Sequence, residues 1–281
     1  MPARAGALNA AADQDLGWLS HSRAAVIRFR EGQPLRAADD VAEEVPVALV
    51  YNRVPHVVML ATPLDLEDFA LGFSLTEGII ASASEMNSVR VLNRAEGIEV
   101  RIRIPEERFA CLSEKERNLT GRTGCGLCGT ASLRQAVRHP GAVTSDVRLA
   151  PVDLHAALDE LGEHQRLNGI TGAIHAAAWA LPSQRIQLVR EDVGRHNALD
   201  KLIGALVRLS VDRRAGFVII TSRASYEMVQ KCASAGIGLM AAISAPTGLA
   251  IRLAEETGVT LIGFARQGTH TLYAHPERVI F

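Results

Sequence analysis

Short apolar runs bounded by turn residues recur through the first hundred positions of the chain, which is typical of β-structure. Residues 24–29 form one such run. Residues 45–60 form two runs joined by a turn near Asn52 and Arg53, and residues 88–104 alternate between apolar and polar positions on both sides of a turn. The pattern therefore predicts a β-rich first part of the chain that contains hairpins.

Two other segments interrupt this β-pattern. Residues 62–80 place apolar side chains at helical spacing, with Asp65 as the expected N-cap and Gly78 as the expected end of the helix. Residues 113–124 are polar, charged and glycine-bearing, which predicts an exposed loop.

The remaining sequence alternates helical and strand patterns. Helices are expected over residues 130–138, 153–165, 202–209, 226–235 and 249–257. Strands are expected over residues 217–221, 239–244 and 259–265, and a hairpin over 173–190. Strands that alternate with helices through short links predict parallel strands covered by helices.

These patterns predict four segments along the chain. Residues 1–20 are expected to be a mobile N-terminal tail, and residues 21–110 an α+β domain. Residues 111–129 are expected to be a mobile loop that carries a C-x-x-C motif, followed by an α/β domain over 130–281.

Composition narrows the class of protein. The 281 residues include 30 Lys+Arg and 31 Asp+Glu, so the near-zero net charge argues against binding to nucleic acid or membranes by bulk electrostatics. No apolar run is long enough for a transmembrane helix, and the first twenty residues lack the features of a secretory signal. We therefore expect a cytoplasmic protein, in which a close cysteine pair is more often catalytic or metal-binding than a structural disulfide.

Such a pair is present in TGRTGCGLCGTAS, residues 120–132, where Cys125 and Cys128 are flanked by glycines. The glycines allow sharp turns and leave the sulfurs uncrowded. A helix beginning near Thr130 would direct its positive dipole end toward the sulfurs, and Arg122 adds a further positive charge. Both effects favour the thiolate, which is the nucleophilic form of cysteine.

Four interpretations of the pair are open at this point. A zinc site needs four ligands, but Cys111 and Cys232 are single and distant and no H-x-x-x-H motif follows. Dithiol redox chemistry would place the pair after a strand of a small βαβ domain. A sulfur relay, in which a thiolate holds sulfur as a persulfide, suits a glycine-rich loop, and two purely structural cysteines are the fourth interpretation.

A second candidate site follows from the rule that ligands bind at the carboxyl ends of strands in open α/β sheets. The loops expected at these ends are residues 191–197, 222–225, 245–248 and 266–269. Asn197, Ser225 and Thr247 are expected to cap helices there, and helix N-termini together with arginines favour a phosphate ligand. His175 and Asp192 are less certain members, because a buried, hydrogen-bonded structural histidine fits the spacing of His175 better.

Several segments of this sequence together resemble those of the FdhD family of accessory sulfurtransferases, which active formate dehydrogenase requires. The resemblance extends in unbroken order over roughly residues 20 to 281 and rests on the following segments: TPLDLEDFALGFSLTEGII (62–80), GRTGCGLCG (121–129), GAIHAAA (172–178), EDVGRHNALDK (191–201), TSRASYEMVQK (221–231), ISAPTGLAI (243–251), GFARQGT (263–269) and YAHPERV (273–279).

The resemblance implies an α/β fold, with a cytidine-deaminase-like three-layer C-terminal domain and a smaller, β-rich α+β N-terminal domain. It implies a homodimer that accepts sulfur from a cysteine desulfurase. The sulfur would pass to the molybdenum bis(molybdopterin guanine dinucleotide) cofactor, which is the bound substrate, before that cofactor enters formate dehydrogenase. No nucleic acid, membrane or intrinsic metal is implied.

The resemblance also assigns the site residues. It implies that Cys125 carries the persulfide and that Cys128 assists acceptance or release of sulfur. The cofactor-binding segment maps onto Phe264, Ala265, Arg266, Gln267, Gly268 and Thr269. Ser222 and Arg223 join it from the strand-end argument, with Arg223 and Arg266 expected near the phosphates, and guanine nucleotides such as GDP or GMP are expected to mimic the substrate.

A deaminase-like fold raises the alternative of zinc-dependent deamination. That chemistry needs an H-x-E motif upstream of P-C-x-x-C. In this sequence the cysteine pair comes first, no proline precedes Cys125, and His175 is followed by two alanines. Deamination is therefore not expected, whereas a chaperone that only shields the cofactor is a non-enzymatic alternative.

Overall fold

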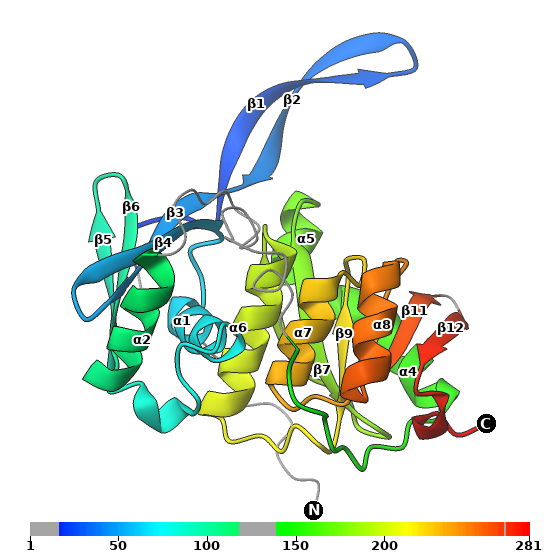
Figure 1. The fold of residues 1–281 in the computed structure, drawn as a ribbon. Helices are drawn as coiled ribbons and strands as arrows, with labels where there is room; N and C mark the ends of the chain where they lie inside the picture. The colour runs from blue at the N-terminus through cyan, green and yellow to red at the C-terminus, as the bar shows by residue number, and fades with distance from the viewer. Residues whose placement is uncertain (1–16, 118–138, 267) are drawn as a thin grey trace, which may run out of the picture.

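The computed structural model describes residues 17–117, 139–266 and 268–281, and it arranges their strands in three sheets (Figure 1). The predicted helix over 130–138 lies outside these residues, as do Cys125, Cys128 and Gln267.

The first sheet is a long hairpin that projects from the rest of the molecule (Figure 1). It pairs β1 (His21–Arg30) with β2 (Gln33–Ala42) in antiparallel register. The run at 24–29 is confirmed as part of β1. The sequence analysis missed β2, because QPLRAADDVA lacks the clustered apolar residues of a buried strand. Both strands are largely exposed, including the side chains of Ile27 and Phe29.

The second sheet has four strands in the order β4-β3-β6-β5. The strands are β3 (Val45–Tyr51), β4 (Val54–Ala61), β5 (Ser88–Arg94) and β6 (Gly97–Arg103). Both predicted pairs are antiparallel hairpins, as expected, and β3 pairs with β6 in parallel. The turn between β3 and β4 has positive φ angles at Asn52 and Arg53.

Two helices and a short 3-10 turn accompany this sheet. They are α1 (Leu66–Thr76), α2 (Glu106–Arg117) and η1 (Ala83–Glu85). The helix predicted over 62–80 is confirmed as α1, and Asp65 is its N-cap residue, although the Asp65 side chain makes no capping hydrogen bond. The prediction of a loop from residue 113 is wrong up to Arg117, because α2 continues through this charged stretch.

The third sheet has six strands in the order β12-β11-β10-β9-β7-β8. Their bounds are β7 (His175–Leu181), β8 (Arg185–Asp192), β9 (Phe217–Ile220), β10 (Leu239–Ala242), β11 (Thr260–Arg266) and β12 (Thr269–Ala274). The predicted parallel strands are confirmed as β9, β10 and β11. The predicted hairpin is β7-β8, and β12, which the pattern missed, pairs antiparallel with β11.

Helices cover both faces of the six-stranded sheet. They are α4 (Pro151–His164), α5 (Arg166–Thr171), α6 (Arg195–Arg208), α7 (Tyr226–Ser234) and α8 (Gly248–Thr257), with a 3-10 turn η2 (Pro276–Arg278) near the end. One buried cluster joins α6, α7 and α8 to the sheet, and a separate cluster joins α4 to the opposite face. The α/β character expected of this part is therefore present.

The first half of the chain packs on the second where α1 meets α6 (Figure 1). Two glycines allow this contact. A Cβ atom on Gly72 would lie 1.7 Å from the carbonyl oxygen of Asp200, and one on Gly204 would lie 1.9 Å from that of Asp68. Because backbone atoms occupy the space of a side chain, the helices approach closely only with glycine at both positions.

Ion pairs on the buried carboxylates of Asp68 and Asp200 link these helices to each other and to β8 and α7. The Asp68 carboxylate accepts hydrogen bonds from Arg190 and Arg208. The Lys231 ammonium donates to Asp200 and to the hydroxyl of Thr76, at 2.9–3.0 Å. The motif residues of 62–80 and 191–201 thus join the two halves of the molecule.

Candidate functional site

The loops that follow β9, β10 and β11 lie in direct contact and form what we call the rim. The Ala224 amide donates to the carbonyl of Ala245, and the Thr247 amide donates to the carbonyl of Ala224. The Phe264 amide donates to the carbonyl of Ser244 at 3.2 Å. The expectation that these strand ends meet at one edge is confirmed by the hydrogen bonds.

The segment Phe264–Thr269 lies where β11 turns into β12, and an irregular register separates Gly263 from Arg266. Phe264 has φ of 50°, an uncommon left-handed conformation for a bulky residue, and its side chain is 40% exposed. Arg266 is exposed, whereas Ala265 is buried. The left-handed turn at Phe264 therefore places an aromatic ring and an arginine at the solvent-facing side of the rim.

Hydrogen bonding and glycine shape the same turn. Thr269 Oγ1 donates to the carbonyl of Arg266 at 2.8 Å, and Gly268 has φ of 74°. A Cβ atom on Gly263 would lie 2.8 Å from Pro246 Cδ, so glycine lets β11 pass close to the neighbouring loop.

Ser222 and Arg223 follow β9 on this rim. Ser222 is buried and its hydroxyl donates to the Arg223 carbonyl at 3.1 Å, while the Arg223 side chain is exposed. The Arg223 side chain is thus free to reach solvent on the rim, and the hydroxyl of Ser222 stabilises the loop that carries it.

The three predicted caps differ in outcome. Thr247 caps α8 by accepting a hydrogen bond from the Ala250 amide, as expected. Ser225 occupies the N-cap position of α7, but its hydroxyl donates to Glu227 and makes no capping bond. The prediction for Asn197 is wrong, because α6 already begins at Arg195 with Gly194 as N-cap.

Asn197 instead belongs to a buried network around Asp192. Asp192 Oδ1 accepts from the Gly194 amide and the Asn197 side chain, and Oδ2 accepts from the Thr62 amide. Lys201 Nζ lies 2.7 Å from Oδ2, with both side chains fully buried. All of these contacts are with other residues of the chain, so Asp192 ties β8, α6 and the residues before α1 together.

His175, Arg195 and His196 lie at the other end of the same edge. His175 opens β7 opposite Asp192, and the Ala176 amide next to it donates to Thr221 Oγ1 just after β9. The expectation of a buried, hydrogen-bonded His175 is wrong, since it is only partly buried and its imidazole makes no hydrogen bond to another residue of the described ranges. Burial first, and then the charge of Arg195, lower the pKa of His175.

A carboxylate pairs with the second histidine. His196 Nε2 lies 3.0 Å from Glu227 Oε2 on α7. This hydrogen bond is the main reason that the pKa of Glu227 is lowered. The sequence patterns gave no signal for the contact, which joins residues 31 positions apart.

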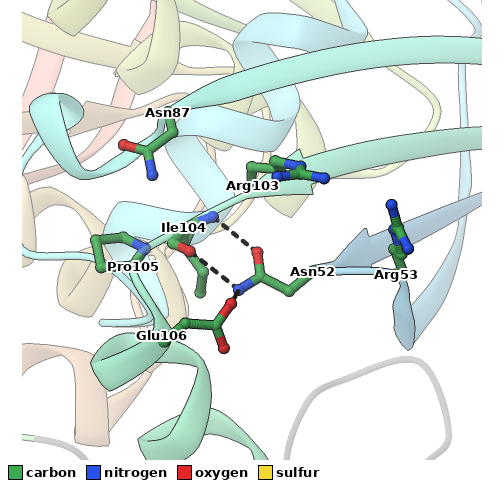
Figure 2. Close-up of a pocket in the computed structure, with 7 residues that line it drawn as sticks. All are labelled: Asn52, Arg53, Asn87, Arg103, Ile104, Pro105 and Glu106. Carbon is green, nitrogen blue, oxygen red and sulfur yellow. Dashed lines mark hydrogen bonds between the residues drawn. The ribbon is translucent and has the colours of Figure 1, made fainter.

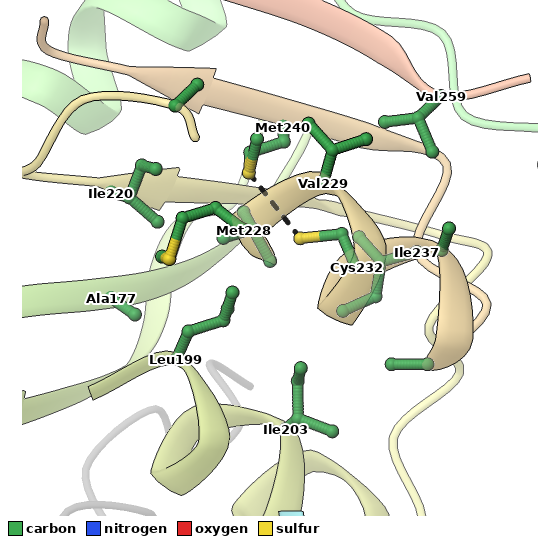
Figure 3. Close-up of a cluster of buried hydrophobic side chains, with 14 of the residues drawn as sticks. Ala177, Leu199, Ile203, Ile220, Met228, Val229, Cys232, Ile237, Met240 and Val259 are labelled. Carbon is green, nitrogen blue, oxygen red and sulfur yellow. Dashed lines mark hydrogen bonds between the residues drawn. The ribbon is translucent and has the colours of Figure 1, made fainter. Parts of the chain in front are cut away.

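The two cysteines within the described ranges have opposite surroundings. Cys232 lies on the buried face of α7, and its thiol donates to Met240 Sδ at 3.6 Å (Figure 3). Burial raises the pKa of Cys232 to about 12, so it does not form a thiolate near neutral pH. Cys111 on α2 is exposed.

A hollow of about 530 Å³ lies in the N-terminal part, beside the β3-β4 turn and the start of α2 (Figure 2). Asn52 there accepts from the Ile104 amide and donates to the Ile104 carbonyl and to Glu106. The polar groups of the Asn52 side chain are thus engaged in holding the β3-β4 turn to the end of β6.

Within residues 17–117, 139–266 and 268–281, no three His, Cys, Asp or Glu side chains are grouped so that they could hold a metal ion. No helix in the ranges that the structure covers has the length and apolar character needed to cross a membrane.

Comparison with known proteins places this geometry in context. The sequence profile described as the FdhD/NarQ family matches residues 42–280. The sulfur carrier protein FdhD of Cupriavidus necator is 55% identical over 260 residues, which cover 92% of this chain and 90% of the relative. That of Xanthomonas euvesicatoria is 54% identical over 254 residues, covering 90% of each.

A solved structure is also similar. The crystal structure from Desulfotalea psychrophila, assigned as a formate dehydrogenase accessory protein, superposes with a TM-score of 0.72 at 25% sequence identity. The match covers 93% of this chain and 100% of that one.

Proposed function

The chain belongs to the FdhD/NarQ family, and on that premise we propose that it is a sulfur carrier that serves formate dehydrogenase. The observation that carries the proposal is identity above 50% to proteins named sulfur carriers, over about nine-tenths of both chains. A cytoplasmic homodimer and a cytidine-deaminase-like C-terminal domain stay predictions.

Cys125 is the proposed sulfur-carrying residue. Its thiolate would attack the terminal sulfur of a persulfide on a cysteine desulfurase, which breaks the S–S bond of that persulfide and releases the desulfurase cysteine as a thiolate. The sulfur would then be held on Cys125 as a persulfide, with Cys128 assisting acceptance or release. The surroundings of Cys232 remove it from the candidates, because a thiol with a pKa near 12 cannot compete as a nucleophile. Cys111 is exposed and is therefore included as a variant in the test of the sulfur step.

The rim is the proposed docking site for the molybdenum bis(molybdopterin guanine dinucleotide) substrate. The exposed ring of Phe264 is suited to stack on a guanine base, since base–aromatic stacking uses the π-face of both partners. Arg223 and Arg266 are both exposed on the rim and can pair with phosphate oxygens. The N-terminus of α8, capped by Thr247, adds a positive dipole end on the same edge.

Intact mass spectrometry tests the sulfur step directly. The protein is incubated with a cysteine desulfurase and free cysteine, then weighed before and after thiol reduction. We expect reducible sulfur adducts on the wild type and on Cys111→Ser, and none on Cys125→Ala. Adducts that persist in Cys125→Ala would assign the carrier role to another thiol.

Two alternatives give different results in companion experiments. A chaperone that only shields the cofactor would restore formate dehydrogenase activity equally with Cys125 and Cys128 both replaced by alanine. A zinc protein would contain stoichiometric zinc by elemental analysis after purification.

A further inference from the structure

The β1-β2 hairpin leaves one of its two faces uncovered. Residues directly opposite each other in an antiparallel pair lie on the same face, so the register sorts the hairpin side chains into two sets. The apolar members of one set are all exposed, and we call the face that they form the open face: Ala25, Ile27, Phe29, Pro34 and Ala38. Ile27 and Phe29 are 68% and 70% exposed. The open face therefore presents its largest apolar side chains to solvent.

The opposite face of the hairpin is better satisfied within the chain. Arg28 Nη2 lies 3.2 Å from Asp39 Oδ1 on this face. Leu35 and Val41, toward its two ends, are exposed, but its central apolar side chains are partly buried: Ala24, Val26 and Ala37. The open face is thus the less covered of the two.

Exposure of this kind is unfavourable for a projecting arm (Figure 1). Two strands alone are marginally stable in water, and further strands or a covering layer are normally needed. Each strand has ten residues, so the arm is about 30 Å long at roughly 3.3 Å per residue. The helix α5 approaches β2, yet the open face stays exposed. An apolar face with this reach is typical of a surface that meets another protein.

The charges on the β2 side of the open face select the partner. Arg36 lies across from Ile27 toward the tip of the arm, and Asp40 lies across from Arg23 toward its base. Neither Arg36 nor Asp40 forms an ion pair with another residue of the described ranges. A strand with a positive charge toward one end and a negative charge toward the other is complementary to a copy of itself turned by 180°.

We propose that the open faces of two copies of this chain pack against each other, with the twofold axis at Ala38. The strand β2 then lies over β2 of the other copy, and Arg36 of each copy meets Asp40 of the other. On β1, Arg23 lies over Ile27 of the other copy, so that its aliphatic stem covers that side chain. The small side chain of Ala38 lets the two arms approach closely at the axis. This inference rests on the homodimer of the proposed function and names the surface that forms it.

Two charge reversals and their mixture test the interface. Sedimentation velocity over a range of concentrations measures the dissociation constant of the dimer. Arg36→Asp brings like acidic charges together at both symmetric contacts, and Asp40→Arg brings like basic charges together. Each variant alone should therefore dimerise about tenfold or more weakly than the wild type. An equimolar mixture of the two variants has opposite charges at both contacts and should dimerise with nearly the wild-type constant.

Three results of this experiment would overturn the proposal. The first is a monomeric wild type, as expected if another part of the chain or a different protein covers the open face. The second is undiminished dimerisation of both single variants, which would place the interface elsewhere on the molecule. The third is a mixture that dimerises no better than its components.

Chemical crosslinking locates the axis independently of charge. In Ala38→Cys a thiol from each copy lies at the axis, so a short thiol-to-thiol crosslinker should join two copies. Ala37→Cys is the matched control, because the neighbouring alanine lies on the opposite face. Cys111 is exposed in both variants, so its contribution to the covalent dimer is the same. Equal yields of covalent dimer from the two variants would contradict the position of the axis.

Sulfur loading separates this inference from the sulfur-carrier proposal. Arg36→Asp should take up sulfur on Cys125 in the mass experiment while its dimer is weakened. A wild type that dimerises through the arm but takes up no sulfur would count against the sulfur carrier alone. A wild type that takes up sulfur as a monomer would count against the arm interface alone.

Discussion

The contact between α1 and α6 and the rim are both rich in charged residues and glycines, yet they treat these residues in opposite ways. At the helix contact Asp68 binds two arginines, and Lys201 binds Asp192 out of contact with solvent. On the rim, Arg223 and Arg266 are exposed and carry no ion pair to another described residue. Charges satisfied inside the protein stabilise the fold, whereas charges left unpaired at one edge are available to a ligand.

The same difference applies to the sequence segments on which the family resemblance rests, because charged side chains in several of them pair inside the protein. The segments at 62–80 and 191–201 contain acidic, basic and amide side chains of the kinds found in active sites. In the structure most of these side chains form hydrogen bonds or ion pairs with one another.

Replacing Lys201 by methionine should have the largest effect on stability. The change leaves the buried Asp192 carboxylate without its cation, which typically costs about 3–5 kcal/mol. Urea unfolding followed by circular dichroism measures the loss. Arg214→Gln removes a pair with Asp146 that is largely exposed, so its cost should stay below about 1 kcal/mol. Similar costs for the two variants would contradict the distinction between buried and exposed charge.

Gly204→Ala should be the next most damaging change. The added Cβ meets the Asp68 carbonyl, so α1 and α6 must separate, at a cost of roughly 1–3 kcal/mol. Gly162→Ala in α4 is the control, because a Cβ there meets nothing within 4 Å. Alanine should stabilise that helix by about 0.5–1 kcal/mol. Thermal unfolding of both variants checks the sign, and a neutral Gly204→Ala would mean that the helices do not pack as described.

Arg266→Gln should change binding and leave stability intact. Loss of one charge-assisted contact to a phosphate should weaken GDP binding by about tenfold, while the unfolding free energy stays within about 0.5 kcal/mol of wild type. Titration with GDP and urea unfolding of the same sample measure both quantities. A destabilised variant with normal GDP affinity would assign Arg266 to the fold.

The smallest expected effect is on the acid dependence of stability. The hydrogen bond from His196 lowers the pKa of Glu227, so the stability that this carboxylate provides is present above its ordinary pKa of 4.5 and is lost as the pH falls through the lowered value. As the pH falls from 5 to the point of acid unfolding, the unfolding free energy of His196→Gln should therefore decrease less than that of the wild type. The difference should be under about 1 kcal/mol. Urea unfolding across that pH range checks the slope, and an identical slope in both proteins would show that the pair is not formed in solution.

Much of the fold could be predicted because turn residues and apolar runs coincide. The β3-β4 hairpin is signalled by Asn52 and Arg53 between apolar strands, and β9 to β11 by short apolar runs that alternate with helices. The strand β2 and the end of α2 were missed because their residues are polar or charged and are stabilised by pairing and helix continuation that no local pattern records.

The site was less predictable, since its contacts are long-range. The meeting of the loops at Ala224, Ala245 and Phe264 follows from sheet topology, which the alternation of elements revealed. The partners of Asp192 and His196 come from residues distant in sequence, so their roles could not be read from spacing. The left-handed Phe264 likewise depends on the turn between β11 and β12.

A transfer assay with radioactive sulfur shows whether sulfur held on Cys125 passes to a ligand bound at the rim. The protein is loaded with ³⁵S from labelled cysteine and a desulfurase, separated from both, and incubated with the guanine-dinucleotide form of the molybdenum cofactor. We predict that label moves to the cofactor, and that excess GDP or Arg266→Gln suppresses the transfer. Label that stays on the protein, or that moves equally well with excess GDP, would contradict the account.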